Sequence, residues 1–481
     1  MAGKARGKSV FVEKHRQKTN GGKHAEDKMS RSAGALLVDK ISQLPDALLE
    51  SILSHMTLRE AARTSVLSSR WYKVWTFIPD LNFDASVTLR FLEVQRVLEV
   101  QRIQELLMIE RHKYVNWVNS VLESYQGLTL DKFSVGFDLN GDFGHDIDRW
   151  VNFALEKKVR RLVIDFRNYA GYPQYEHYRF PFTVFRLPSG TLHTHNVGFS
   201  KCSSLRVLLL RQVAITGDVV EYFLSNCPFL EQLCVEGSDL IVDLKVPEPL
   251  HCLKYLEVKY CFNVKSIDIS ATNLFSFKYF GPRFIMSYEK LPNLVELDIK
   301  GPYSDYIVDN PSLLSNYAFR LQTLRLRVMH VKESMGLLRF PVLTRLKTLE
   351  LAVEAKDGDS LLLFAPLIKA SPSLCRFTMK LSLQLRNPCG RRIQQKLPRC
   401  PHQCLKVVEI IGFQGCTIDN EFAAYLVENA VMLEKIIIDP RQPLLLGTPW
   451  EYDHMEKIRT ARKRAKQFKT NLSLGSKLLL L

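Results

Sequence analysis

Cysteine and histidine residues gather near the C-terminal end of the sequence. Cys400, His402, Cys404 and Cys416 offer three thiols and an imidazole, which is a possible donor set for tetrahedral zinc. The spacing argues against such a site, because these residues do not form the paired Cys-x-x-Cys clips that zinc sites use. We expect core or turn cysteines here and no bound metal.

The rest of the sequence offers little that could carry a reaction. It has no glycine-rich phosphate loop and no Gly-x-Ser-x-Gly nucleophile turn. His145, Asp146 and Asp148 read as the first turn of a helix, where acidic side chains are favourable. We therefore expect no catalytic residue and no cofactor.

The net charge of +16 is concentrated at the two ends of the chain. Residues 1–38 carry +6 and residues 455–481 carry +7, which leaves +3 for the body. The stretch "RTARKRAKQFK" (Arg459 to Lys469) is typical of a solvated, disordered tail, with a nuclear import signal or an anion-binding segment as the alternative. A basic-tailed nucleic-acid binder is the weaker functional alternative.

The sequence also predicts where the protein acts. No window holds the roughly 18 uninterrupted apolar residues of a membrane span, and the N-terminal stretch lacks the apolar core of a secretory signal. We expect a nuclear or cytoplasmic protein, without a membrane partner, whose ten cysteines stay reduced.

The segment from Leu44 to Trp75 predicts three short helices that share one apolar side. Pro45 suits a helix start, and Thr57 and Ser68 can cap the second and third helices. A unit this small cannot bury enough surface alone, so its apolar side must pack on this chain or on another protein.

A short apolar pattern recurs through most of the remaining chain. The pattern L-x-x-L-x-L, with other apolar residues allowed, begins at Leu205, Leu230, Leu253, Leu274, Leu294, Leu321, Leu346, Leu374, Leu405 and Leu433, with degenerate copies at Leu130 and Val159. Its spacing is that of leucine-rich repeats, in which the first, fourth and sixth residues stack into one core.

The helical segment resembles the F-box of plant proteins, most specifically in "RTSVLSSRW" (Arg63 to Trp71). The repeats resemble the plant leucine-rich type, and residues 400–439 resemble the FBD module of F-box/FBD/LRR-repeat proteins. The sequence departs from the F-box pattern at Met56-Thr57, where a Leu-Pro pair is usual. Met fills the same apolar gap, and Thr can cap a helix.

The resemblance implies an α/β fold: a small helical F-box, then an irregular leucine-rich-repeat solenoid (a horseshoe) with a strand-helix-strand C-terminal cap. The predicted segments are a basic tail (1–38), the F-box (39–85), a helical linker with a local duplication (86–125), the repeats (126–398), the FBD-like cap (399–440) and a basic C-terminal tail (441–481).

The F-box resemblance also implies binding to a Skp-type adaptor, and through it to a cullin–RING ubiquitin ligase. The residues expected to bind the adaptor are Leu44, Pro45, Leu48, Leu49, Ile52, Leu53, Met56, Leu58, Leu67 and Trp71.

Outward side chains of the repeat strands are the candidates for binding a target. Alternation along each strand directs the third and fifth residues of each copy outward. The candidates are Tyr255, Glu257, Lys278, Glu296, Asp298, Arg325 and Arg376. Acids and bases are mixed, which suits a protein partner better than nucleic acid. The sequence thus predicts a non-catalytic, substrate-recognition subunit of an SCF-type ubiquitin ligase. The alternative is a repeat scaffold that binds partners without degradation.

Overall fold

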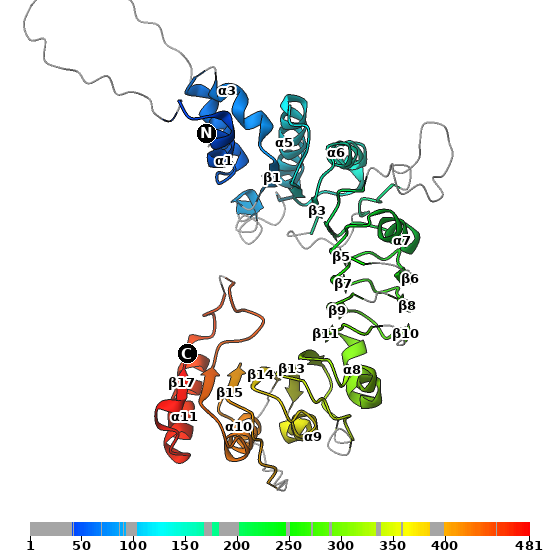
Figure 1. The fold of residues 1–481 in the computed structure, drawn as a ribbon. Helices are drawn as coiled ribbons and strands as arrows, with labels where there is room; N and C mark the ends of the chain where they lie inside the picture. Colours follow the sequence, from blue (N-terminus) through cyan, green and yellow to red (C-terminus); the bar gives the residue numbers. More distant parts are fainter. Residues whose placement is uncertain are drawn as a thin grey trace, which may run out of the picture. The chain divides into compact units, whose positions relative to one another are not determined.

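The computed structural model divides the chain into two units, residues 1–44 and 45–481 (Figure 1). The structure describes residues 41, 43–68, 70–85, 87–89, 91–92, 103–167, 176–181, 202–246, 251–270, 273–287, 291–332, 338–356, 359–384, 399–448 and 450–481. The predicted basic tail 1–38 and most of the duplicated stretch 92–103 lie outside these residues.

The larger unit begins with the predicted short helices, α1 (Asp46–Leu53), α2 (Leu58–Arg63) and α3 (Trp71–Val74), with 3₁₀ turns at Thr64–Val66 and Trp75–Phe77. Thr57 caps α2 as predicted, in a reciprocal capping box with Glu60. Ser68 Oγ accepts a hydrogen bond from the Trp71 backbone N–H at 3.3 Å. The N-cap residue of α3 is nevertheless Arg70, without a side-chain cap, so the predicted Ser68 cap is wrong.

One parallel sheet of fourteen strands runs through the described residues of this unit. The strands, in sheet order, are β1 (Asp80–Asp84), β2 (Lys132–Gly136), β3 (Arg161–Asp165), β4 (Val207–Arg211), β5 (Gln232–Glu236), β7 (Tyr255–Lys259), β9 (Ser276–Phe280), β11 (Glu296–Lys300), β12 (Thr323–Val328), β13 (Thr348–Lys356), β14 (Arg376–Gln384), β15 (Val407–Ile411), β16 (Lys435–Asp439) and β17 (Leu478–Leu480).

The repeat pattern predicts the core of this sheet correctly. In all ten copies from Leu205 onward, the first, fourth and sixth residues are buried. In-register pairing stacks them, as where Leu208 lies opposite Leu162 on one side and Leu233 on the other. Each copy therefore buries its apolar side only through its neighbours.

The connections between strands return along one face of the sheet (Figure 1). Helices make most of these returns: α5 (Ile103–Ser124), α6 (Gly144–Glu156), α7 (Gly217–Asn226), α8 (Pro302–Asp309), α9 (Ala365–Lys369) and α10 (Thr417–Asn429). In three central copies the return contains a strand instead, and β6 (Asp243–Val246), β8 (Ser266–Ile269) and β10 (Ile285–Ser287) pair into a small parallel sheet. We call the opposite face of the large sheet, which carries the third, fifth and seventh residues of the copies, the open face.

The F-box helices are joined to the repeats through the sheet itself. The stretch that follows them, Asp80–Asp84, does not simply end the helical unit but forms strand β1, which pairs with β2. Thr76 O accepts hydrogen bonds from the Gln126 and Gly127 backbone N–H groups, at 3.0 and 3.2 Å. The helices and the repeats therefore share one hydrogen-bonded framework.

The C-terminal region differs from the expected disordered tail. Met455–Asn471 forms helix α11, and Leu478–Leu480 forms β17, which pairs with β16 beyond the FBD-like segment. Ile458, Ala461 and Phe468 are buried on one side of α11. This stretch is highly charged, but its apolar residues recur with the period of a helix. A count of its composition does not show that spacing, so the helix was not predicted. Among the described helices, none has the length and apolar character needed to cross a bilayer.

We predict that Phe83→Ala will lower the free energy of unfolding by about 3–5 kcal/mol, because it removes a buried ring at the junction of β1 with β2. The Phe83 ring packs edge-on against Trp117 and Phe133, with ring centroids 5.2 and 5.7 Å apart. Denaturant titration would measure the loss, with Phe319→Ala at a 73% exposed position as the control. Equal, small losses in both variants would contradict a packed junction.

Candidate functional site

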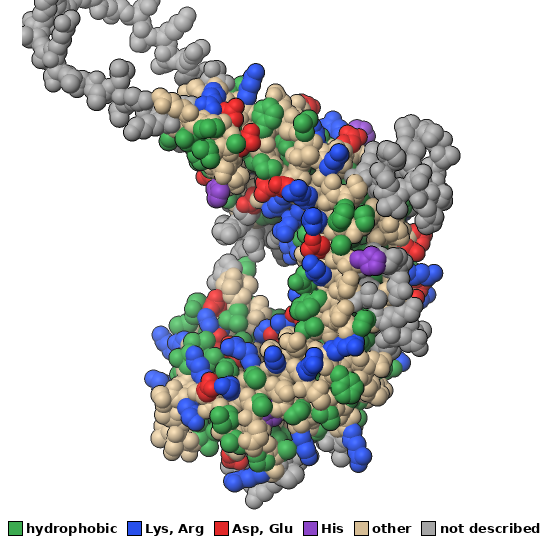
Figure 2. All heavy atoms as spheres, in the orientation of Figure 1, with side chains coloured by type: hydrophobic (Ala, Val, Ile, Leu, Met, Phe, Trp, Pro, Cys, Tyr) green, Lys and Arg blue, Asp and Glu red, His purple; other side chains and the backbone are tan. Residues whose placement is uncertain are grey.

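Helix α1 carries two neighbouring apolar stripes with different surroundings. Leu49 and Leu53 are fully buried, whereas Leu48, Ile52 and Met56 are 50%, 38% and 42% exposed. Leu48 and Ile52, four residues apart in α1, lie on one face of the helix, and Met56 follows in the turn just beyond its end. We call these three exposed residues the ridge. Hydrophobic side chains gather on this part of the surface in Figure 2.

The structure separates the ten predicted adaptor-binding residues into two groups. Leu49, Leu53, Leu58 and Trp71 lie in the interior and support the helices rather than present a surface. Pro45 and Leu67 are exposed together with the α1 ridge, and Leu44 is partly exposed. The sequence pattern could not separate the groups, because both stripes of α1 are apolar.

Three exposed residues of this helical unit were missed by the sequence reasoning. Val66, Tyr72 and Phe77 are 87%, 64% and 40% exposed. The sequence signal that could have identified them is that they are apolar residues within or shortly after the F-box-like run from Arg63 to Trp71. Several large apolar side chains exposed within one small helical unit are typical of a binding surface.

The orientation of the helices is fixed in part by a charged contact. Arg70 donates to Asp46 through Nε at 2.9 Å and through Nη2 at 2.6 Å, which ties the start of α1 to the start of α3. Both side chains are substantially exposed, so the contact positions the helices more than it stabilises them.

The second candidate surface is the open face of the sheet, where acidic, basic and hydrophobic side chains intermix (Figure 2). Across five adjacent strands the fifth residues of the repeats lie in register and alternate in charge. This row, which we call the charge ladder, consists of Glu257, Lys278, Asp298, Arg325 and Glu350. The alternation of charge along this row cancels much of its field above the sheet.

Most of the predicted target-binding residues on this face are already paired within the chain. Glu296 accepts from Ser276 Oγ at 2.7 Å and from Arg325, and Arg325 also lies 3.7 Å from Glu350. Arg376 lies 3.5 Å from Glu409. Asp298 is buried, so it is a poor contact for a partner.

The seventh residues of the copies also belong to this face, and the sequence reasoning missed them. Lys259, Lys300 and Lys380 lie there, and each contacts a carboxylate of the charge ladder. The same two-residue alternation that identified the third and fifth positions would have found them.

The structure gives the cysteine and histidine residues near position 400 a structural role. Two backbone N–H groups, from Cys404 and Leu405, donate to His402 Nδ1 at 3.3 and 3.1 Å. Nε2 lies 2.9 Å from the Ser371 carbonyl oxygen, which assigns a neutral ring that donates through Nε2. Both ring nitrogens are thus used by the backbone, which leaves neither for a metal.

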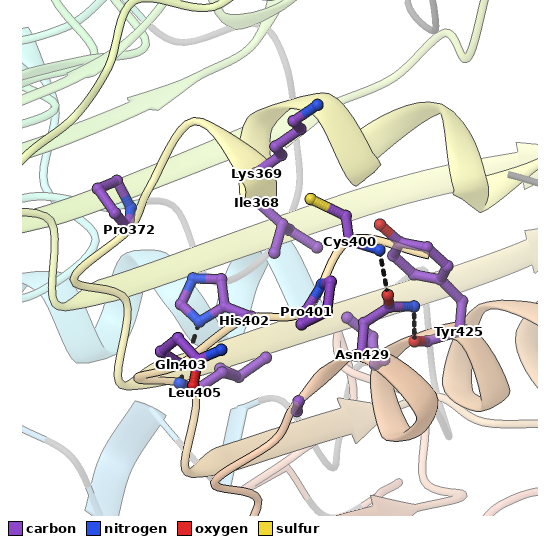
Figure 3. Close-up of a pocket in the computed structure, with 12 residues that line it drawn as sticks. Ile368, Lys369, Pro372, Cys400, Pro401, His402, Gln403, Leu405, Tyr425 and Asn429 are labelled. Carbon is purple, nitrogen blue, oxygen red and sulfur yellow. Dashed lines mark hydrogen bonds between the residues drawn. The ribbon is translucent and has the colours of Figure 1, made fainter. Parts of the chain in front are cut away.

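A pocket of about 200 Å³ opens beside His402, between α9, α10 and the loop before β15 (Figure 3). Asn429 spans its wall: its Oδ1 accepts from the Cys400 backbone N–H at 2.6 Å, and its Nδ2 donates to the Tyr425 carbonyl at 2.8 Å. Asn429 thus fixes the loop that precedes β15.

Among the described residues, one group of three potential metal ligands lies close enough together to share an ion: Cys234, Glu236 and Glu257 on the open face. Glu236 lies 3.3 Å from Arg211, and Glu257 contacts Lys259, so cations of the chain already compensate both carboxylates. Burial, and then the charge of Glu257, raise the pKa of the Cys234 thiol to about 12, which disfavours the thiolate a metal would need.

Comparison with known proteins identifies both parts of the chain. Residues 121–466 match a family model described as the LRR domain of At1g61320/AtMIF1, and residues 41–79 match the F-box domain. The FBD-associated F-box protein At5g60610 of Arabidopsis thaliana is 25% identical over 82% of this chain and 98% of its own length. From the same plant, F-box/FBD/LRR-repeat protein At4g26340 is 25% identical over 84% and 93%, and F-box/LRR-repeat protein At2g42730 is 28% identical over 83% and 91%. These matches confirm the F-box and repeat resemblances.

We predict that Glu296→Gln will destabilise the protein at pH 7 by about 1 kcal/mol, and that the difference will narrow in acid. Burial raises the pKa of Glu296, but the Ser276 hydroxyl and the Arg325 charge outweigh it and hold the pKa below its usual range. The ionised carboxylate therefore stabilises the fold above its unfolded-state pKa of about 4.3, and the contribution is lost as pH falls through the lowered folded pKa.

Thermal unfolding of both proteins between pH 7 and pH 3.5 would measure this narrowing. Glu434→Gln, which breaks an exposed pair with Lys406, is the matched control and should have a smaller effect at pH 7. A Glu296→Gln deficit that stays constant across the range would show that the carboxylate charge is not responsible.

Proposed function

Because this chain belongs to the F-box/leucine-rich-repeat family, we propose that it is the substrate-recognition subunit of an SCF-type cullin–RING ubiquitin ligase. In this role the F-box binds a Skp-type adaptor, and the repeats bind a protein that is to be ubiquitinated. The observation that carries the proposal is the exposed ridge formed by Leu48 and Ile52 on α1 and by Met56 just beyond its end.

The chemistry of the ridge favours a protein partner. Its three side chains are apolar, and Leu67 adds a fourth exposed apolar side chain in the same unit at 64% exposure. Burial of a leucine or isoleucine against a partner contributes roughly 1.5–3 kcal/mol, so a few such residues can dominate an interface. Leu49 and Leu53, on the buried side of α1, pack this helix into the interior of the unit.

The way the F-box joins the sheet supports a positional role in catalysis. The helices are continuous with β1, so an adaptor on α1 and a target on the open face would be held in a fixed geometry. Fixing two reactants in this way raises their effective concentration without a catalytic group on the chain itself. We accordingly assign no nucleophile, metal or cofactor to this protein.

The finer features of the fold belong to the same proposal. We propose that the repeats curve as a horseshoe, and that the strand-helix-strand segment β15–α10–β16, together with α11 and β17, caps its end. The nine described cysteines form no disulfide with one another, which supports action in a reducing compartment, the nucleus or the cytoplasm.

We predict that the double variant Leu48→Asp/Ile52→Asp will bind a purified Skp-type adaptor at least tenfold more weakly than the wild type, because two charges replace the apolar ridge. The full-length protein would be co-precipitated with the adaptor over a concentration series. Leu128→Asp, at an 87% exposed position between α5 and β2, is the matched control. Undiminished binding by the double variant would refute the assignment of the ridge.

A second measurement separates the ligase from the non-degradative scaffold. A target of the ligase should have a longer half-life in cells that express the double variant in place of the wild type, and proteasome inhibition should abolish the difference. A scaffold would bind the same adaptor but leave the half-life of its partners unchanged.

A further inference from the structure

Exposed aromatic side chains mark both ends of strands β7 and β9 on the open face. At the start of the strands, Tyr255 and Phe275 are 43% and 42% exposed, with ring centroids 6.2 Å apart. At the end, Tyr260 is 41% exposed and its ring lies 4.4 Å from that of Phe280. Four rings thus form two pairs, one at each end of the same two strands.

The backbone of Tyr260 is left-handed, with φ of +54°, a conformation that side chains disfavour. Tyr260 occupies the position directly after the strand, where other copies place Gly237, Gly301 and Gly412, with φ between +75° and +83°, and where one copy places Gln212, with φ of +52°. A glycine would make this turn with less strain, so a tyrosine here carries an energetic cost.

A cation without an ion pair lies between the two aromatic pairs. Lys278 sits opposite Glu257 and Asp298 in the register of the sheet. Both carboxylates instead contact lysines of their own strands, Lys259 and Lys300. Within the described residues, no carboxylate lies in ion-pair range of the Lys278 side chain, which is partly exposed.

The register places these features at equal steps along the strands. Tyr255 lies opposite Ser276, Glu257 opposite Lys278, and Lys259 opposite Phe280. Lys278 is therefore two residues from the levels of Tyr255 and Phe280, which are about 13 Å apart at roughly 3.3 Å per residue. Phe275 and Tyr260 each lie one residue further out. In an extended peptide, side chains two residues apart point to the same side with the same step.

We propose that this part of the open face binds an extended segment of the target, in which an acidic residue lies between two apolar residues, each two positions away. The apolar side chains would pack on the two aromatic pairs, and the carboxylate would pair with Lys278. This inference rests on the proposed function only in naming the bound segment as part of the ligase target. The binding itself depends on the open face alone.

The surrounding charges favour this occupant over a nucleic acid. The charge ladder alternates in sign on both sides of Lys278, so this part of the face offers a cation without a close ion pair, whose charge also acts on Glu296, rather than a basic track. A single carboxylate flanked by apolar side chains complements that distribution.

Fluorescence anisotropy with short peptides and the full-length protein would test the proposal. The probe is a fluorescein-labelled peptide with the central sequence Phe-Thr-Glu-Thr-Phe between Gly-Ser flanks. Replacement of its Glu by Gln should weaken binding about fivefold, through loss of the ion pair. Moving the two Phe residues to one or three positions from the Glu should also weaken binding, because the anchors no longer match the aromatic pairs.

Two variants of the protein make the test specific. Lys278→Glu should reverse the preference, so that a Phe-Thr-Lys-Thr-Phe peptide binds better than the Glu peptide. Lys435→Glu, at an exposed third position of β16, is the matched control and should keep the wild-type preference. Tyr260→Gly should weaken binding about tenfold without lowering the unfolding temperature, since glycine accepts the left-handed turn.

The outcomes separate this inference from the ligase proposal. If the Glu peptide fails to bind, or binds equally well to wild type and Lys278→Glu, the peptide site is refuted, whatever the result of adaptor binding. If the charge reversal succeeds but the adaptor does not bind, the peptide site stands and the ligase proposal falls. A short labelled oligonucleotide that binds more tightly than the Glu peptide would point to the nucleic-acid alternative.

Discussion

Parallel pairing between neighbouring strands is the constraint on which the rest of the structure depends. A residue such as Leu233 is fully buried only because the copies on both sides supply the walls of its environment. Burial of such a side chain contributes roughly 1.5–3 kcal/mol, and the contribution disappears if either neighbour detaches. The copies therefore stabilise one another, and a defect in one strand is felt by those beside it.

The same constraint explains why the F-box helices do not behave as an independent module. Strand β1 places them inside the stacked framework, and helix α5 reinforces the junction. Tyr114 of α5 donates to the Phe83 carbonyl at 3.0 Å and accepts from the Gly136 N–H at 2.9 Å, which links β1 to the end of β2. The Arg59 guanidinium of α2 lies 4.3 Å from the ring centroid of Trp117 on α5. The helices that carry the exposed ridge are thereby fixed relative to the open face.

Much of this fold was predictable from the sequence, because the apolar repeat follows directly from the geometry of stacked strands. The F-box helices were also predictable, since Thr57 is a strong local signal for a helix start. The C-terminal helix was not predicted, because composition weighs its many cations but not the spacing of Ile458, Ala461 and Ala465. The spacing of apolar residues shows which of them share a face of a helix. It does not show which of the two apolar faces of α1 is covered by the rest of the chain and which is exposed.

The candidate sites were less predictable, for a related reason. Alternation along a strand correctly directs the third and fifth residues to the open face, yet it does not say how they pair there. Glu257 and Asp298 each had two lysines within reach, one on their own strand and Lys278 on the next. The choice depends on side-chain conformation in three dimensions, and it decides which lysine forms the close ion pair.

The separation between the two faces of the sheet has a consequence for how such proteins can change. Substitution of a buried residue such as Leu256 removes packing on which two neighbouring copies depend. The pairs on the open face are partly exposed, and pairs of that kind contribute only about 0–1 kcal/mol each. Paired side chains such as Arg376 and Lys380 can therefore be exchanged at little cost to stability. Recognition can thus diverge while the apolar rows, and with them the position of the F-box, stay the same.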